Sequence, residues 1–364
     1  MLTALLVIAI LVFLIVVHEF GHFIAAKIFG VRVEEFGVGY PPRALSFGRW
    51  GETEYTLNWI PFGGFVRLFG DEGEGVHGRG SLMDAPRWKQ AVILVAGVAM
   101  NALGAWFLFS LALHIGVPQA VATVPVGQHA QLIVSDVVPA SPAAAAGLKA
   151  GDEITDITDS KGARVIDGLT PEAVVAFVSA RGGKPITVSY IDNGKQLTTQ
   201  VTPANAVVPG AEGRPALGIA LALVTIESEQ WGASIEDALY QTGNAFENVG
   251  GSLWSILNSA IHGAPNLSGV VGPVGIVNYV GQASQEGYGS VLLLAALISV
   301  NLAIINLIPI PALDGGRLFV LIIEALLRRR APRLSIQVLN FIGVSLIIVL
   351  MLVVTYHDIG RLLA

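Results

Sequence analysis

The chain has no cysteine among its 364 residues and few charged residues, 13% in all, whereas 53% of its residues are hydrophobic. The absence of cysteine excludes disulfides and thiolate metal sites, so any zinc ion would need histidine and carboxylate ligands. A net charge of −6 without a long basic run argues against nucleic acid as a partner. The mean hydropathy of +0.66 lies well outside the range of soluble proteins, so much of the apolar surface must face lipid.

Four apolar segments have about the 20 residues that a helix needs to cross a bilayer. They are Leu2 to Ala26, Ala91 to Val117, Val291 to Ile310 and Val338 to Val354. The first segment lacks the basic start and the small-residue cleavage site of a signal peptide, so we expect it to be retained as a helix. The sequence therefore predicts a mainly α-helical multi-pass membrane protein with four transmembrane helices.

Basic residues are concentrated in the loop after the first span and in the short loop after the third, which contains Arg328-Arg329-Arg330. Basic loops of membrane proteins face the cytoplasm, so we expect both loops there. The two termini and the large middle region are then expected on the outer side.

The first span runs into His18-Glu19-Phe20-Gly21-His22, directly after an apolar run from Ala4 to Val17. Two histidines four residues apart lie on one face of a helix and can bind one zinc ion, with Glu19 beside them as general base. Ionisable groups are costly at bilayer depth, which favours this function over two solvated or core histidines. We therefore expect His18 and His22 as metal ligands, Glu19 as the catalytic residue and hydrolysis as the reaction.

A second motif, Asn306 to Gly316 (NLIPIPALDGG), ends the third span. Pro309 and Pro311 cannot both continue a helix, so the helix is predicted to break there, and unwound backbone in a membrane protein lines a cavity. Asp314 is the one carboxylate in this apolar segment and is the predicted third ligand.

Two asparagines of the third span, Asn301 and Asn306, are candidates to bind the scissile carbonyl or a substrate strand. They could instead be interhelical hydrogen-bond partners. Pro309 and Pro311, in the break, are expected to line the same substrate site.

Between the first two spans the sequence predicts a small membrane-associated β-region, about residues 31–70, rich in Val, Phe, Tyr and Leu between Gly and Pro. An exposed strand edge there could hold an extended substrate by main-chain hydrogen bonds, with Gly64 and Phe65 as candidate contacts. The alternative is a cytoplasmic hairpin without a substrate role.

The middle region, about Val121 to Val224, is predicted to be a separate domain because charged residues return there. The run SPAAAAGLKAGDEITDI from Ser141, followed by a predicted helix at Pro171–Ser179 and two predicted strands, resembles a circularly permuted PDZ (α+β) domain. This resemblance implies a loop that offers backbone N–H groups to a peptide C-terminus, and Leu217 and Gly218 are the candidates. An ordinary turn at these residues, or a domain that acts only as a steric plug, are alternatives.

Apolar residues recur every three or four positions from Trp231 to Ile261, which predicts an amphipathic helix at the outer interface or packed against the PDZ-like domain. The predicted division of the chain is 1–120 for the first half of the membrane core, 121–224 for the PDZ-like domain, 225–287 for the amphipathic helix and linker, and 288–364 for the second half of the core.

The motifs HEFGH and NLIPIPALDGG together resemble those of the site-2 proteases, which are intramembrane zinc metalloproteases. Gly63 to Arg67 and Ser268 to Ile276 extend the likeness. The order resembles the bacterial regulator of sigma-E protease group, although members often carry two PDZ domains and this chain has room for one. The resemblance implies a Zn²⁺ cofactor, a location in the bacterial inner membrane, and single-span membrane proteins such as anti-sigma factors as substrates after a first cut. It also implies that the PDZ-like domain binds a peptide or processed substrate tail.

Two other functions would explain part of the sequence. A zinc transporter would place His and Asp at membrane depth, but it would need ligands on several helices and has no use for a PDZ domain. A membrane-anchored PDZ adaptor would leave the HEFGH and LDGG motifs without a purpose.

Overall fold

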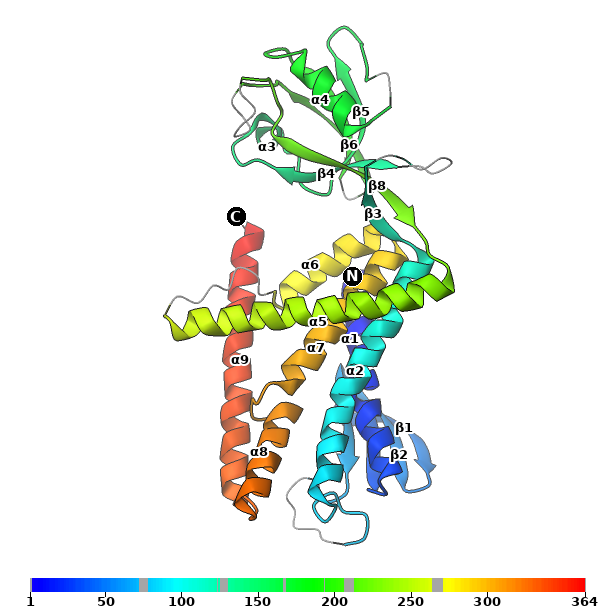
Figure 1. Ribbon diagram of the computed structural model, residues 1–364, viewed down its shortest axis with the longest axis vertical. Coiled ribbons are helices and arrows are strands. Elements are labelled where there is room, and N and C mark those ends of the chain that lie inside the picture. The colour runs from blue at the N-terminus through cyan, green and yellow to red at the C-terminus, as the bar shows by residue number, and fades with distance from the viewer. Residues whose placement is uncertain are drawn as a thin grey trace. The chain divides into compact units, whose positions relative to one another are not determined.

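The computed structural model describes residues 2–71, 78–122, 124, 130–165, 168–192, 194–205, 213–263 and 271–363. These residues form two compact units (Figure 1). Unit 1 comprises Met1–Ile115 and Glu229–Ala364, and unit 2, Gly116–Ser228, is inserted between them in the chain. Ser268 to Val270, the first part of the segment Ser268 to Ile276 that extends the likeness to the site-2 proteases, lie outside the described residues.

Four helices in the described part of unit 1 are long and apolar enough to cross a membrane. They are α1 (Leu2–Ile28), α2 (Arg87–Ile115), α7 (Tyr288–Leu307) and the Leu334–Gly360 part of α9 (Arg333–Leu363). The four predicted helices are thus confirmed, but α7 ends earlier than predicted, at Leu307 instead of Ile310. Ile308 is already extended, with ψ of 139°, because the residue before a proline disfavours the helical region.

The predicted β-region consists of two long, bent antiparallel strands, β1 (Val33–Trp50) and β2 (Thr53–Leu68). Phe36 pairs with Val66 on one side and with Tyr55 on the other, so the first part of β1 is central and residues 64–68 form an outer segment. Among the described residues, no further strand pairs with this outer segment.

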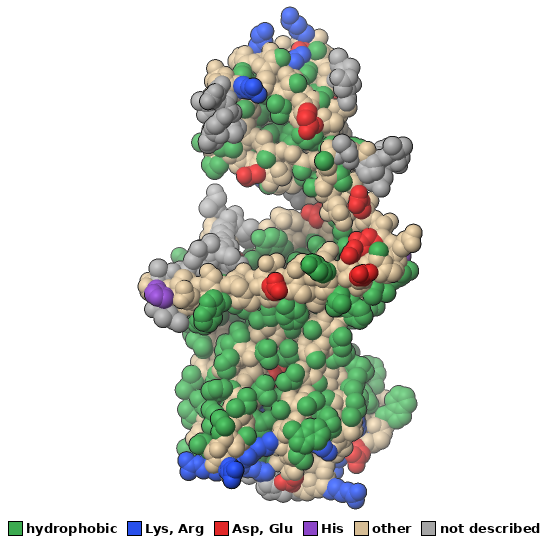
Figure 2. All heavy atoms as spheres, in the orientation of Figure 1, with side chains coloured by type: hydrophobic (Ala, Val, Ile, Leu, Met, Phe, Trp, Pro, Cys, Tyr) green, Lys and Arg blue, Asp and Glu red, His purple; other side chains and the backbone are tan. Residues whose placement is uncertain are grey.

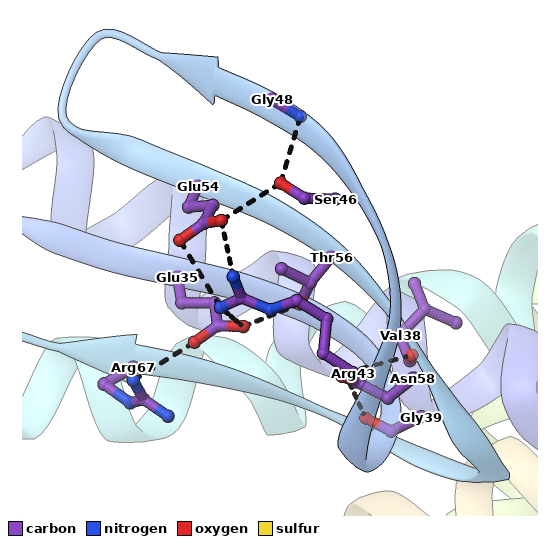
Figure 3. Close-up of polar contacts among 10 residues, drawn as sticks. All are labelled: Glu35, Val38, Gly39, Arg43, Ser46, Gly48, Glu54, Thr56, Asn58 and Arg67. Carbon is purple, nitrogen blue, oxygen red and sulfur yellow. Dashed lines mark hydrogen bonds and ion pairs between the residues drawn. The ribbon is translucent and has the colours of Figure 1, made fainter.

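A buried carboxylate joins three segments of this sheet (Figure 3). The Glu35 side chain, about 7% exposed, accepts hydrogen bonds from Arg43 and Thr56 and forms an ion pair with Arg67 at 3.1 Å. Arg43 also binds Glu54 at 2.7 Å. A buried charge is tolerated only when it is paired and hydrogen-bonded in this way, so the network fixes how the strands fold over one another.

Helix α5 (Trp231–Ile261) has the predicted bounds and lies across α2 and α7, with which it is in contact (Figure 1). The indole of Trp106 on α2 donates to the Ile235 carbonyl at 3.0 Å. Helix α6 (Pro273–Glu286) follows, and the Asp358 carboxylate of α9 accepts from the Gly275 N–H at 2.9 Å. Because carboxylates stabilise helix N-termini, this contact fixes the start of α6 against α9.

Figure 2 shows hydrophobic side chains over the visible face of the transmembrane helices of unit 1. Lys and Arg side chains gather at the end where α9 follows α8 (Asp314–Leu327), and Arg328, Arg329 and Arg330 in that connection are exposed. This distribution of side chains is that of a membrane-embedded surface with a basic rim.

Unit 2 is a six-stranded antiparallel sheet in the order β3-β8-β4-β5-β6-β7. Its strands are β3 (Val117–Val121), β4 (Gln131–Val137), β5 (Glu153–Asp159), β6 (Ile186–Asp192), β7 (Lys195–Val201) and β8 (Ile219–Glu227). Two helices accompany the sheet, α3 (Pro142–Ala145) and α4 (Pro171–Ser179), and α4 has the predicted bounds. Each begins with a hydroxyl N-cap, Ser141 or Thr170, followed by proline at the first turn, which is the arrangement preferred at helix starts.

Candidate metal centre

The two histidines of the first motif and the aspartate of the second meet in unit 1, although they are almost 300 residues apart in sequence. Nε2 of His18 lies 2.9 Å from Oδ2 of Asp314, and Nε2 of His22 lies 3.1 Å from the same oxygen. The two Nε2 atoms are 3.1 Å apart. In the described part of the chain, these three residues form the one such group of possible metal-binding side chains.

The spacing of the three donor atoms fits a zinc ion. A tetrahedral zinc site with bonds of about 2.0–2.1 Å separates its ligand atoms by about 3.3–3.4 Å, only slightly more than the distances here. Two imidazoles and one carboxylate are also a ligand set that leaves a fourth position open for water, as in catalytic zinc sites. Both histidines are buried, so bulk water does not compete for them from all sides.

Helix α2 packs closely enough on α1 to contact both histidines because position 97 is glycine. A Cβ atom there would lie 2.7 Å from Cε1 of His18 and closer still to the His22 ring, so a larger residue would displace the ligands. One turn earlier on α2, the Ile93 carbonyl lies 2.7 Å from Nδ1 of His22. A carbonyl only accepts, so Nδ1 donates and the Nε2 lone pair of His22 points to the site.

Asp314 reaches the histidines because the chain breaks between α7 and α8. Asp314 is the first residue of α8, after a non-helical stretch at residues 308–313. The stretch folds back tightly over the start of α8: a Cβ on Gly316 would lie 2.9 Å from Cα of Pro311. The prolines thus end α7 as predicted. Gly315 and Gly316 of the LDGG motif leave room for the backbone of residues 307–311, which packs against the start of α8.

Glu19 lies next to the three donors and faces the outer segment of the β-region. A Cβ on Gly64 would be 3.6 Å from Cγ of Glu19, and the Val66 backbone N–H donates a hydrogen bond to the Glu19 carboxylate. A carboxylate beside two histidines and a strand edge is suitably placed to exchange protons with a water at this site. The structure therefore brings together Glu19, Gly64 and the three predicted ligands.

Other residues that the sequence suggested for substrate binding have different surroundings. Asn301 donates to the Leu297 carbonyl of its own helix at 2.9 Å. Phe65 stacks on Tyr40, with ring centroids 6.5 Å apart. Asn306 and Pro311 are half-buried and Pro309 is exposed, all within or next to the break between α7 and α8.

In unit 2, the side chain of Leu217 is buried in the apolar core, and the Leu217 and Gly218 carbonyls accept from the Ala143 and Val138 N–H groups. Gly218 has φ of +81°, a conformation that glycine adopts without strain. Gly218 forms a bend directly before β8.

Two residues with contacts at the site were not predicted, nor was an ion pair that links α8 to the β-region. Asn101 of α2 lies 3.2 Å from Nδ1 of His18, and the Ile93 carbonyl contacts His22. Arg317, one turn into α8, forms an ion pair with Asp71 at the end of β2 and so ties the helix that carries Asp314 to the β-region. An asparagine inside an apolar span was a usable signal. A backbone carbonyl gives none in the sequence.

Solved structures similar to part of the chain are PDZ domains. The PDZ domain of the SdrC-like protein from Listeria monocytogenes matches 28% of this chain and 93% of its own length, with 24% identical residues and a TM-score of 0.21.

Relatives cover nearly the whole chain. A Clostridium perfringens protein, named as a candidate zinc metalloprotease, is 33% identical over 95% of both chains. The zinc metalloprotease RasP of Shouchella clausii is 29% identical over 99% of both chains, and RasP of Geobacillus kaustophilus is 28% identical over 96% of this chain and 95% of its own. The profile described as peptidase family M50 matches residues 6–350. This chain therefore belongs to peptidase family M50, the site-2 protease family that its two motifs indicate.

Proposed function

We propose that this membrane zinc metalloprotease hydrolyses peptide bonds within or beside the transmembrane segment of single-span membrane proteins. The observation that carries the proposal is the meeting of His18, His22 and Asp314 beside Glu19, between helices long and apolar enough to cross a membrane. His18, His22 and Asp314 are the proposed zinc ligands. Neither a transporter nor an adaptor is favoured by a specific observation.

When bound, the zinc ion supplies Lewis-acid activation of a water and of the substrate carbonyl. The Glu19 carboxylate takes the proton of the attacking water and passes it to the nitrogen of the leaving amine. The Val66 N–H orients Glu19 for both steps, and the Ile93 carbonyl holds the His22 ring so that its Nε2 faces the site.

We further propose that the substrate binds as an added strand along residues 64–68 of β2, the outer segment next to Glu19. A helix hides its carbonyl groups in its own hydrogen bonds, so a transmembrane substrate must unwind before it can pair with this edge. Gly64 lies close to the catalytic carboxylate and Phe65 flanks it. Asn306 at the end of α7, together with Pro309 and Pro311 in the break, supplies the proposed contacts on the opposite side of the strand.

The proposed substrates are anti-sigma factors or similar proteins that have already lost their outer domain by a first cut. Unit 2 is proposed to be a PDZ-like domain on the outer side that excludes bulky substrates or binds a processed tail. A cavity of about 630 Å³ beside α4, lined by Val175, Ala176, Arg214 and neighbouring residues, supports the second role. The basic rim at the connection between α8 and α9 supports a cytoplasmic position for that end of unit 1 in a bacterial inner membrane.

The proposal is tested with full-length protein in detergent or liposomes and a single-span reporter substrate. Glu19→Gln keeps the size of the side chain but removes the proton acceptor, so cleavage should fall by about two to four orders of magnitude while zinc content stays at one per chain. Glu236→Gln, on the exposed face of α5, is the matched control and should cleave like wild type. Cleavage by Glu19→Gln within about tenfold of wild type would contradict the role of Glu19.

A further inference from the structure

Asn101 is a buried polar residue in the middle of the transmembrane helix α2. The proposed mechanism does not use this residue. Its side chain is on the face of α2 that packs on α1, and the residue is 0% exposed. Nδ2 lies 3.2 Å from Nδ1 of His18. The other end of the carboxamide, Oδ1, is buried and has no hydrogen-bond partner among the described residues.

The arrangement around His18 differs from that around His22 in one respect. The Nδ1 atom of His22 faces an oxygen, the Ile93 carbonyl, whereas Nδ1 of His18 faces an amide nitrogen. An uncharged imidazole carries one proton, so a ring that gives Nε2 to a metal ion holds this proton on Nδ1. The Nδ1–H of His18 would then point at the N–H donors of Asn101.

Two donors cannot face one another in a buried site, because neither would have an acceptor. A half-turn of the Asn101 carboxamide exchanges Oδ1 and Nδ2, which have nearly the same size, and brings the unpartnered oxygen to Nδ1. The Nδ1–H of His18 would then face an oxygen acceptor about as far away as Nδ2 of Asn101 is now, without movement of the backbone.

We infer that Asn101 is a positioning residue for His18: its Oδ1 accepts the Nδ1–H of His18 when zinc is bound, and so keeps Nε2 of His18 free for the metal. This inference rests on the proposed zinc site. The three contacts of α2 with the histidines then form one stripe four residues apart, Ile93, Gly97 and Asn101, on a single helix face. Positions 93 and 101 orient the two rings and position 97 leaves them space.

The test measures zinc affinity of the full-length protein in detergent by competition with a chelator of known affinity. Asn101→Leu has the same branching at Cγ but no acceptor, and it should weaken zinc binding by about 10- to 100-fold, the usual effect of losing an outer partner of a metal ligand. Asn101→Asp keeps an acceptor on both sides of the group and should bind zinc within about threefold of wild type or more tightly.

Ser299→Ala is the packing control, because Ser299 donates to the Asn101 backbone carbonyl at 2.8 Å, and among the described residues it forms no hydrogen bond with the carboxamide. It should bind zinc like wild type. If Asn101→Leu does not fold, as judged by circular dichroism, Asn101→Ala takes its place in the comparison with Asn101→Asp.

Unchanged zinc affinity in the folded variant without an acceptor would overturn the inference. So would an Asn101→Asp variant as weak as Asn101→Leu, because shape alone would then explain the loss. Wild-type protein that binds no zinc would overturn the proposed function itself, and is thus a different result from either of these.

Discussion

Unit 1 and unit 2 differ in the polar side chains that they bury and in the apolar side chains that they expose. The core of unit 2 is an apolar cluster in which Val134, Ile157 and Val188 are fully buried. Unit 1 buries His18 and Asn101, together with Ser299, on the inner faces of its helices, whereas many of its large apolar side chains are exposed. This contrast follows from the two solvents, since lipid accepts apolar side chains that water would drive inward.

The few buried polar groups of unit 2 serve its backbone. Ser141 caps α3, and the Asp152 carboxylate accepts from the Lys149 N–H at 2.8 Å. Unit 1 has such groups too, for example Asp358 at the start of α6, but the side chains of His18, His22 and Asp314 instead face one another around a single point. The carboxylate of Asp152 thus serves a turn of unit 2, whereas that of Asp314 faces the candidate metal centre of unit 1, and the predictions below test this difference.

The largest effect is expected from a charge change at Asp314 of unit 1, a largely buried aspartate whose side chain is 17% exposed. Asp314→Asn keeps the shape but removes the negative charge of a ligand, so zinc binding should weaken and cleavage should fall together by several orders of magnitude. Metal content and reporter cleavage measure the two effects. Asp152→Asn is the matched change in unit 2 and should leave both unaffected, because its carboxylate contacts only unit 2 residues.

If Asp314→Asn kept full zinc occupancy and activity, the third ligand would be another residue. If Asp152→Asn lost zinc, the difference between the two kinds of buried aspartate would not hold.

A smaller effect is expected from a single methyl group between α1 and α2. Gly97→Ala places a Cβ against both histidine rings, and overpacking of this kind costs about 1–3 kcal/mol or displaces the ligands, so zinc affinity and cleavage should fall by about 10- to 100-fold. Gly232→Ala on α5, where a Cβ meets nothing within 4 Å, is the control. Equal activity of the two variants would show that α2 does not hold the ligands by close packing.

That His18, His22 and Asp314 meet beside Glu19 could be predicted from sequence, because histidines and carboxylates in apolar segments are rare enough to be informative. The position of Asp314 against α1 also followed, since the two-proline break and the lone carboxylate coincide. The spans and the amphipathic helix could be predicted because apolar length and period are local properties. Each of these features can be recognised from the residue types at the positions concerned or at nearby positions in the sequence.

The parts that could not be predicted depend on packing between helices. No pattern in the sequence assigns the Ile93 carbonyl to His22, because any residue at position 93 supplies a carbonyl. Asn301 stays a substrate candidate, and the sequence did not indicate that its side chain donates to the Leu297 carbonyl four residues earlier, a bond that polar side chains on helices can form. Which hydrogen-bond partner a helix side chain meets depends on how far the helix is rotated about its axis. The periodicity of the sequence alone does not determine this rotation.

The smallest effect concerns two aspartates of unit 2 and the pH dependence of its local stability. Burial raises the pKa of Asp152 above its ordinary value of 3.8, so the folded state holds this proton more tightly and stability falls as pH rises through the range just above 3.8. Hydrogen bonds from the Ala163 and Lys161 N–H groups and the ion pair with Arg181 lower the pKa of Asp159, so its contribution is present above 3.8 and is lost as the pH falls below that value.

Each Asn variant should therefore remove one of these two dependences of local stability on pH. In hydrogen exchange of the full-length protein, corrected for intrinsic rates, Asp152→Asn should flatten the loss of protection in β5 and β6 as pH rises above 3.8, and Asp159→Asn should flatten the loss on acidification below it. We expect changes of about twofold in protection, and no change in zinc content. The same slope change in both variants would contradict the opposite signs, because burial acts on Asp152 and hydrogen bonds act on Asp159.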